Sequence, residues 1–222
     1  MQEIEAKFYV RDLKKIEVCL QDLETHLIQP RVLETNIRFD LPNGGLSSKG
    51  QVLRLRQDTE ARLTYKGAGT SEQGVVNRTE IEFVVEDFEK AKSFLEVLGY
   101  QKLLQYDKYR TMYALESTSL LVESQQHTLS GTRAVGLQSC HIMLDELPYG
   151  NFVEIEGEDI AAIHNIADKL NLNWQAVISK SYSALFEITR QSLGLTFTDL
   201  TFANFENIKV SPEHLQVQPA NE

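Results

Sequence analysis

The feature that most constrains this chain is a two-residue alternation of charged and apolar side chains, which begins at the third residue and recurs along the sequence. Near the N-terminus, Glu3, Glu5 and Lys7 alternate with apolar residues. This period is typical of a β-strand with one charged face and one apolar face. The same period predicts further strands at 34–40, 51–57, 61–66, 77–85, 106–114, 120–124, 140–146 and 152–157.

Apolar residues spaced by three and four positions predict four helices, at 13–27, 88–98, 160–170 and 181–193. Asp12 and Asp87 are candidate N-caps for the first two. The polar segment 116–139 is expected to form a hairpin with a long loop. Because strands and helices do not alternate as they do around a parallel sheet, we predict an α+β fold built on an antiparallel sheet.

The length of 222 residues suits one domain. We expect this domain to cover residues 1–190. The remaining residues, 191–222, are expected to form a tail whose first aromatic residues pack against the domain and whose polar end frays.

The charged strand faces carry acidic and basic residues in similar numbers. If the sheet is open, they face water and form cross-strand ion pairs that contribute little. If the sheet closes, they line an interior where unpaired charge is costly without ligands. Divalent metal ions and phosphate groups would compensate both signs, since carboxylates suit Mg²⁺ or Mn²⁺ and Arg and Lys suit phosphate. The acidic set is Glu3, Glu5, Glu80, Glu82, Asp145, Glu154 and Glu156, and the basic set is Lys7, Arg38, Arg54, Arg56, Lys66, Arg78, Lys108 and Arg110.

Composition excludes several other classes of function. A net charge of −10 argues against general binding to nucleic acid or an anionic membrane. No apolar run is long enough to cross a bilayer, and the acidic N-terminus is unlike a secretory signal. The two cysteines show no metal or redox spacing, which favours a reducing, cytoplasmic location. We therefore expect a small-molecule partner, and a homodimer remains open.

A set of motifs follows in a fixed order along the chain. Glu3-Ile4-Glu5-Ala6-Lys7 has the pattern E-x-E-x-K, and the others are Leu53-Arg54-Leu55-Arg56, Thr64-Tyr65-Lys66-Gly67, Arg78-Thr79-Glu80-Ile81-Glu82, Lys108-Tyr109-Arg110, Leu144-Asp145-Glu146, Gly150-Asn151-Phe152-Val153-Glu154-Ile155-Glu156-Gly157 and Lys180-Ser181-Tyr182. Together they resemble the CYTH family, also called the triphosphate tunnel metalloenzymes. The resemblance spans residues 1 to about 187.

The resemblance implies a closed eight-stranded antiparallel β-barrel flanked by helices, whose lumen binds a triphosphate with one or two Mg²⁺ or Mn²⁺ ions. Arg38 stands where many members carry an aromatic residue. The implied metal ligands are Glu3, Glu5, Glu80, Glu82, Asp145, Glu154 and Glu156. The implied substrate-binding residues are Lys7, Arg38, Arg54, Arg56, Lys66, Arg78, Lys108 and Arg110. The implied catalytic residues are Glu5, Glu82, Glu156 and Lys66.

The activity implied by the resemblance is metal-dependent hydrolysis of inorganic triphosphate, a nucleoside triphosphate or thiamine triphosphate. The alternative within the same family is a class IV-type adenylate cyclase, which would convert ATP to cyclic AMP and pyrophosphate. A non-catalytic sensor of polyphosphate or nucleotide is a third hypothesis. The complete set of acidic residues argues against a sensor, because a protein that only binds phosphate needs the basic residues alone.

Overall fold

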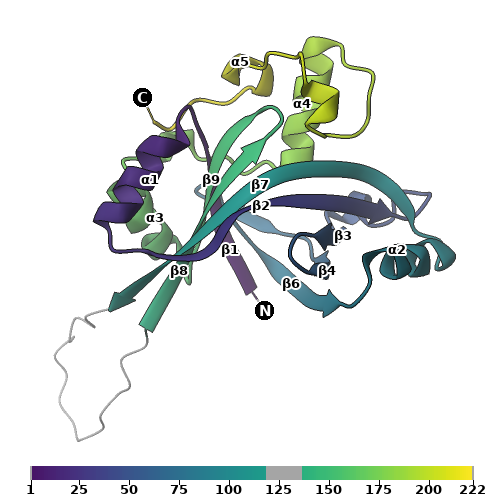
Figure 1. Cartoon of the computed structure of the whole chain (residues 1–222), viewed down its shortest axis with the longest axis horizontal. Coiled ribbons are helices and arrows are strands. Elements are labelled where there is room, and N and C mark those ends of the chain that lie inside the picture. Colours follow the sequence, from purple (N-terminus) through teal and green to yellow (C-terminus); the bar gives the residue numbers. More distant parts are fainter. Residues whose placement is uncertain (1, 119–136, 222) are drawn as a thin grey trace, which may run out of the picture.

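Figure 1 shows the computed structural model of the chain, which describes residues 2–118 and 137–221. Long strands curve around a common centre, and helices lie on their outer side. The strands are β1 (Gln2–Val10), β2 (His26–Asp40), β3 (Val52–Gln57), β4 (Ala61–Lys66), β5 (Thr70–Glu72), β6 (Val75–Val85), β7 (Gln101–Thr118), β8 (Leu137–Leu147) and β9 (Gly150–Glu156). The α-helices are α1 (Leu13–Asp22), α2 (Phe88–Val97), α3 (Ile160–Lys169), α4 (Tyr182–Leu193) and α5 (Pro212–Leu215), and the 3-10 turns are η1 (Ser47–Lys49), η2 (Trp174–Ala176) and η3 (Ala203–Phe205).

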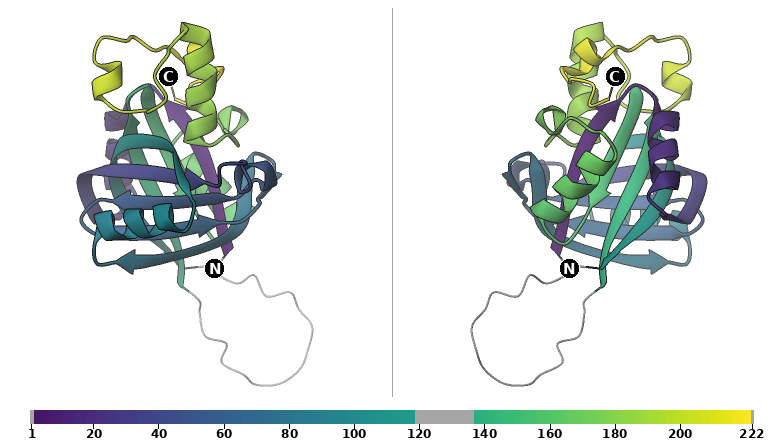
Figure 2. Two further views of the ribbon diagram at one scale, coloured as in Figure 1. Left: turned by 90° about the vertical axis from the view of Figure 1, so that its right-hand side faces the viewer. Right: turned by 90° about the vertical axis from the view of Figure 1, so that its left-hand side faces the viewer.

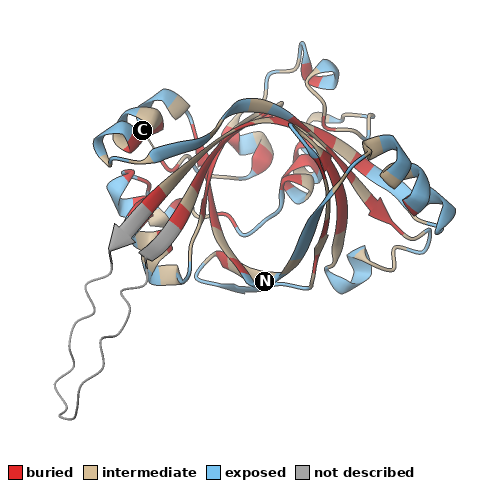
Figure 3. Ribbon diagram, turned by 60° about the horizontal axis from the view of Figure 1, so that its bottom comes forward, coloured by how far each residue is buried: buried red, intermediate tan, exposed pale blue. Residues whose placement is uncertain are grey.

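The strands form a closed ring, which Figure 3 shows along its axis. Neighbouring strands follow the order β1, β9, β8, β7, β2, β3, β4, β6, and all these pairs are antiparallel. Pairing of residues 2–5 of β1 with residues 76–79 of β6 closes the ring. The short β5 pairs with the first residues of β6. Within the described residues, the predicted α+β fold with eight antiparallel strands in a closed arrangement and flanking helices is confirmed.

The strand register places charged residues of neighbouring strands side by side. Across β1 and β9, Glu5 lies opposite Glu156 and Lys7 lies opposite Glu154. Since successive side chains of a strand point to opposite faces, the intervening residues point away from these charges. Ile155 is fully buried in the apolar cluster outside the ring. The alternation in the sequence therefore separates a charged interior from an apolar exterior.

Helices lie against the outside of the ring, as the two views of Figure 2 show, and cover its apolar face. Ile16 of α1 and Ile163 of α3 are fully buried in one cluster with residues of β1, β8 and β9. Leu95 of α2 packs with Leu55 of β3 in a second cluster. Figure 2 also shows α4 at one end of the ring. No helix among the described residues combines the length and the apolar character that crossing a bilayer requires.

The helix boundaries follow the capping residues closely, with one correction. Asp12 and Asp87 cap α1 and α2 as predicted, and each accepts a hydrogen bond from a backbone N–H of the first turn. The prediction that the first helix reaches residue 27 is wrong, because α1 ends at Asp22 and β2 begins at His26. Between them Glu24 has a φ of 54°, a left-handed conformation that a helix cannot continue through.

Several strands are longer than the alternation predicted, and β5 was not predicted. β2 begins before the predicted range 34–40, and β7 extends beyond the predicted range 106–114 at both ends. β7 and β8 pair as the predicted hairpin requires. The strand predicted at 120–124 and the loop of this hairpin lie outside the described residues.

The tail follows α4 and remains packed almost to its end. Leu200 and Phe205 join Phe186 of α4 in a buried apolar cluster. Further along, Leu215 is fully buried, and the backbone N–H of Ala220 donates to the carbonyl oxygen of Tyr9 at 2.8 Å. The polar end is thus tied to β1, which differs from the expectation that it frays. The backbone hydrogen bond to β1 and the burial of Leu215 together hold this part of the tail against the domain.

Candidate active site in the lumen of the strand ring

The ring encloses a cavity of about 660 Å³ whose wall is charged. Side chains from most strands reach it, together with residues of the segment that leads into α4. All predicted site residues except Asp145 line this cavity. They are Glu3, Glu5, Lys7, Arg38, Arg54, Arg56, Lys66, Arg78, Glu80, Glu82, Lys108, Arg110, Glu154 and Glu156.

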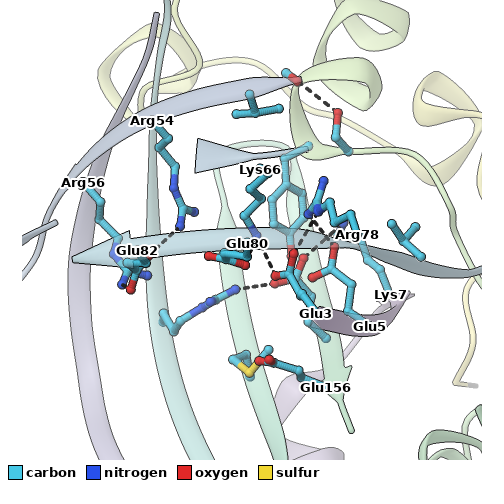
Figure 4. A pocket seen from close by; sticks show the side chains of 18 of the residues that line it. Glu3, Glu5, Lys7, Arg54, Arg56, Lys66, Arg78, Glu80, Glu82 and Glu156 are labelled. Atoms are coloured by element: carbon cyan, nitrogen blue, oxygen red, sulfur yellow. Dashed lines mark hydrogen bonds and ion pairs between the residues drawn. The ribbon is translucent and has the colours of Figure 1, made fainter. Parts of the chain in front are cut away.

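Carboxylates from β1 and β6 meet two cations at one side of the cavity, on the right of Figure 4. Lys66 Nζ lies 2.6 Å from Glu3 Oε1 and 3.1 Å from Glu80 Oε2. Arg78 bridges Glu3 and Glu5 at 2.8 and 2.9 Å. Burial opposes the ionisation of Glu3, but attraction to Lys66 and Arg78 outweighs it and lowers the Glu3 pKa to about 2.

Glu156 lies below these carboxylates in Figure 4. Burial raises the pKa of Glu156 to about 7, and repulsion from Glu3, Glu5 and Glu80 adds to this effect. The repulsion from three other carboxylates, which adds to the larger effect of burial, marks a local excess of negative charge. We call Glu3, Glu5, Glu80 and Glu156 the acidic cluster.

A second group of charges lies on the left of Figure 4, where arginines of β3 surround a carboxylate of β6. Glu82 lies 3.4 Å from Arg54 Nη2 and 3.1 Å from Arg56 Nη2. Its carboxylate also accepts a hydrogen bond of 2.7 Å from the Thr64 hydroxyl. Burial raises the Glu82 pKa, but attraction to Arg56 and the other cations gives a net lowering. Glu82 therefore belongs to the basic part of the wall in this structure.

The deepest charges join β1, β7, β8 and β9. Glu154 is 3.1 Å from Lys7 and also pairs with Arg110. Asp145, which is fully buried behind the wall, accepts from Arg110 Nε at 2.7 Å and lies 3.0 Å from Lys108. Burial disfavours the ionised form of Glu154, yet the adjacent Lys7 and Arg110 hold its pKa well below the usual range.

Tyr182, at the start of α4, connects this deep network to the cavity. Its hydroxyl donates to Asp145 Oδ2 at 2.8 Å, and Lys7 Nζ lies 4.4 Å from the centre of its ring. Ser181 caps α4 by accepting from the backbone N–H of Ala184. The first turn of this helix thereby places polar groups at the cavity wall.

The acidic cluster has the donor chemistry of a divalent-metal site, although its side chains are not assembled around a common point. Mg²⁺ and Mn²⁺ prefer carboxylate oxygens, and a cation would relieve the repulsion that Glu3, Glu5 and Glu80 exert on Glu156. Among the described residues, no three His, Cys, Asp or Glu side chains already stand at ligand distance from one point. In this structure Lys66 forms an ion pair with Glu3, and Arg78 forms one with Glu5. The residues fit the metal in chemistry and charge.

The structure also brings in residues that sequence reasoning missed. Glu34 and Asn36 of β2 are fully buried beside the arginines of β3, and Tyr106 and Tyr182 line the cavity. Glu34 and Asn36 have the same strand parity as Arg38, so alternation could have identified them. Tyr182 belongs to the motif Lys180-Ser181-Tyr182, but no role was predicted for it, because strand alternation does not reach the start of a helix.

Comparisons with known proteins agree with this architecture. The chain matches the model of the CYTH domain over residues 1–182. No functionally curated protein matches it.

Similar solved structures share the fold. A candidate adenylate cyclase from Vibrio parahaemolyticus is 20% identical, with a TM-score of 0.63 over 83% of this chain and 97% of that one. A Pyrococcus horikoshii protein is 25% identical, with a TM-score of 0.57 over 81% of this chain and 95% of that one. A candidate adenylyl cyclase from Hippeastrum, reported to have a dominant triphosphatase activity, is 18% identical, with a TM-score of 0.54 over 97% of this chain and 100% of that one. Because the family model covers most of the sequence, this chain belongs to the CYTH domain family.

Proposed function

We propose that the protein hydrolyses a triphosphate-bearing substrate in the lumen of the ring, with the help of Mg²⁺ or Mn²⁺. The substrate class includes inorganic triphosphate, nucleoside triphosphates and thiamine triphosphate. The observation that carries the proposal is that one cavity combines cations suited to phosphate oxygens with carboxylates suited to a divalent metal. Membership of the CYTH family and the triphosphatase activity reported for the Hippeastrum protein support it.

We assign metal binding to the acidic cluster. When bound, one or two divalent ions would neutralise phosphate oxygens and activate water for attack. Glu82, Glu154 and Asp145 are paired with cations of the wall, so we place them in the support of the phosphate site. Their predicted role as metal ligands stays a prediction.

The basic residues of β3 and β7 would hold the phosphate chain. Arg54 and Arg56 present guanidinium groups that can bind phosphate oxygens through two donors at once. On β7, Lys108 contributes a compact ammonium charge and Arg110 a forked guanidinium group to the cavity wall. In the proposal the terminal phosphate lies beside the acidic cluster, and the rest of the chain extends along these cations.

Hydrolysis adds water to the terminal phosphorus and breaks its bond to the bridging oxygen. The terminal group leaves as orthophosphate, and the remaining phosphates retain the electron pair of the broken bond. Charge therefore develops on oxygens that Lys7, Lys66 and Arg110 can stabilise without any covalent participation by the protein. Lys66 pairs with Glu3 and Glu80 in this structure, and it would be available to the substrate if those carboxylates held a metal ion.

An adenylate cyclase is the second candidate, because the Vibrio parahaemolyticus protein of similar fold is named as one. In that reaction the 3′-hydroxyl attacks the α-phosphate and pyrophosphate leaves. The cation set would serve either reaction, so the products decide between them.

The test is product analysis with purified protein and Mg²⁺ or Mn²⁺. Inorganic triphosphate, ATP and thiamine triphosphate are supplied separately, and the variants Glu5→Gln and Glu146→Gln are run in parallel. We expect orthophosphate from at least one substrate, a loss of about 100-fold or more in Glu5→Gln, and no loss in Glu146→Gln, whose carboxylate pairs with Arg31 on the outer surface. Cyclic AMP and pyrophosphate would identify a cyclase instead, and binding without any product would identify a sensor.

A further inference from the structure

Glu34 is a buried carboxylate to which the proposed reaction gives no role. It lies on β2, is 1% exposed and is not part of the cavity wall. The chain leaves it in the interior beside charged residues of β3 and β7, whose strands flank β2 in the ring. Burying a carboxylate in this way costs free energy unless nearby cations compensate its charge.

The neighbours of Glu34 are cations whose side chains also line the cavity. Its carboxylate oxygens lie 3.4 Å from Lys108 Nζ, 3.7 Å from Arg56 Nη1 and 4.0 Å from Arg110 Nε. Two of these distances exceed the range of a hydrogen bond, and the third lies at its edge. By contrast, Arg110 donates to Asp145 at 2.7 Å. Glu34 therefore acts on the three cations by charge more than by close hydrogen bonds.

The surroundings of Glu34 contain polar atoms without hydrogen-bond partners. Within the described chain these include Glu34 Oε2, both amide atoms of Asn36, and the Nε atoms of Arg54 and Arg56. Buried polar atoms without partners lower stability, so an arrangement selected for stability alone would pair them. Arg56 Nε has only an ion pair of 3.4 Å with Asp58. The Arg54 and Arg56 side chains, which line the cavity, are instead suited to phosphate oxygens that enter with a ligand.

We propose that Glu34 is a positioning residue, which holds Arg56, Lys108 and Arg110 from behind so that their donors face the phosphate chain. Its negative charge also limits how tightly these cations retain phosphate. The inference rests on the proposed function in one respect, namely that phosphate occupies the cavity. The low pKa of Glu34, about 2, agrees with a permanently ionised group, since attraction to Lys108 and Arg110 outweighs the opposing effect of burial.

Replacing the charge separates the two effects. In Glu34→Gln, we expect inorganic triphosphate to bind metal-free protein roughly threefold more tightly or better, because one nearby negative charge is lost. We expect kcat to fall about tenfold, because the three cations repel one another and leave their productive geometry. A residue that only stabilised the fold would lower the melting temperature and the active fraction, and would leave the affinity of the folded protein unchanged.

The conservative variant keeps the inference testable even if Glu34→Gln does not fold. Glu34→Asp retains the charge but withdraws it by one methylene, so triphosphate affinity should match the unaltered protein while kcat falls. Glu146→Gln, which removes an exposed carboxylate on β8, is the matched control and should change neither quantity.

Calorimetric titration with inorganic triphosphate measures affinity, and phosphate release measures kcat. Unchanged or weaker binding in Glu34→Gln, or an unchanged kcat in either variant, overturns the inference. If the unaltered protein binds triphosphate without hydrolysing it, the proposed function fails, and the affinity comparison alone then decides whether Glu34 limits phosphate binding.

Discussion

Glu154 and Glu156 both project from β9 into the lumen, yet they meet opposite surroundings. Glu154 lies between Lys7 and Arg110, whereas Glu156 faces other carboxylates. The identical chemistry of the two side chains hides this difference in the sequence, where both belong to one motif. At the scale of residues, the fate of each charge depends on which strand lies opposite it.

Glu154→Gln should destabilise the protein. The change leaves Lys7 and Arg110 buried with an incomplete set of partners, and breaking a buried pair in this way costs about 3 kcal/mol. Chemical denaturation at pH 7 measures the effect. The surface variant Glu146→Gln should lose less than about 1 kcal/mol, and equal losses in both variants would contradict the burial argument.

Glu156 should give the metal-free protein an unusual pH dependence. Its ordinary pKa of 4.5 is raised to about 7 in the folded state, so between these values the folded protein binds a proton that the unfolded chain does not. Its contribution to stability therefore falls as pH rises from about 4.5 to 7.

Glu156→Gln should remove this fall. Relative to the unaltered protein, the variant should gain about 1 to 2 kcal/mol between pH 5 and pH 8, after allowance for solvent screening of a partly exposed group. Urea denaturation of both proteins across this range measures the difference. A difference that does not vary with pH would exclude a raised pKa at this position.

Sequence alone could identify most residues of the lumen, because alternation fixes the side of the strand to which each belongs. It could not divide the carboxylates, since Glu82 and Glu154 pair with cations from strands that are distant in the sequence. It also could not show that Asp145 lies behind the wall, fully buried. Cross-strand register and burial decide these points, and both depend on the whole ring.

At the scale of elements, the strands were predicted well in kind and less well in length. Regular alternation marks the charged part of each strand, but β2 and β7 continue through segments where the alternation fades, because pairing with each other sustains them. The first helix was predicted too long because Leu27 continues the apolar spacing. The left-handed residue Glu24 ends that regularity, and a single sequence carries no signal for it.

The N-terminus of α4 provides an element-scale test. Ser181 and Asp159 cap α4 and α3, and each loss should cost about 1 kcal/mol. α4 begins at the cavity wall and α3 packs outside the ring, so Ser181→Ala should also lower kcat/KM for the triphosphate substrate, whereas Asp159→Ala should not. Thermal denaturation and steady-state kinetics of both variants measure this. Equal kinetics would show that the first turn of α4 takes no part in binding.

At the scale of the whole molecule, the ring encloses acidic and basic side chains in one cavity, where they are less hydrated than on an open surface. Metal and triphosphate should therefore act together on stability. A ligand that binds only the folded state adds about 2.7 kcal/mol at a hundredfold excess over its Kd.

We expect Mn²⁺ and inorganic triphosphate together to raise the melting temperature by more than the sum of their separate effects. Arg56→Ala should reduce the increment due to triphosphate and preserve the increment due to metal. Glu5→Gln should reduce the increment in melting temperature due to metal, and should weaken triphosphate binding only as a consequence. Additive shifts that are the same in all three proteins would mean that the ligands bind at unrelated sites.

The central claim is that the lumen binds a divalent metal beside a phosphate chain. Anomalous diffraction at the manganese edge, from crystals grown with Mn²⁺ and inorganic triphosphate, tests it most directly. The account predicts a manganese peak among Glu3, Glu5, Glu80 and Glu156, with phosphate density extending along Arg54, Arg56, Lys108 and Arg110. A lumen without manganese and phosphate at saturating concentrations, or phosphate bound only on the outer surface, would contradict it.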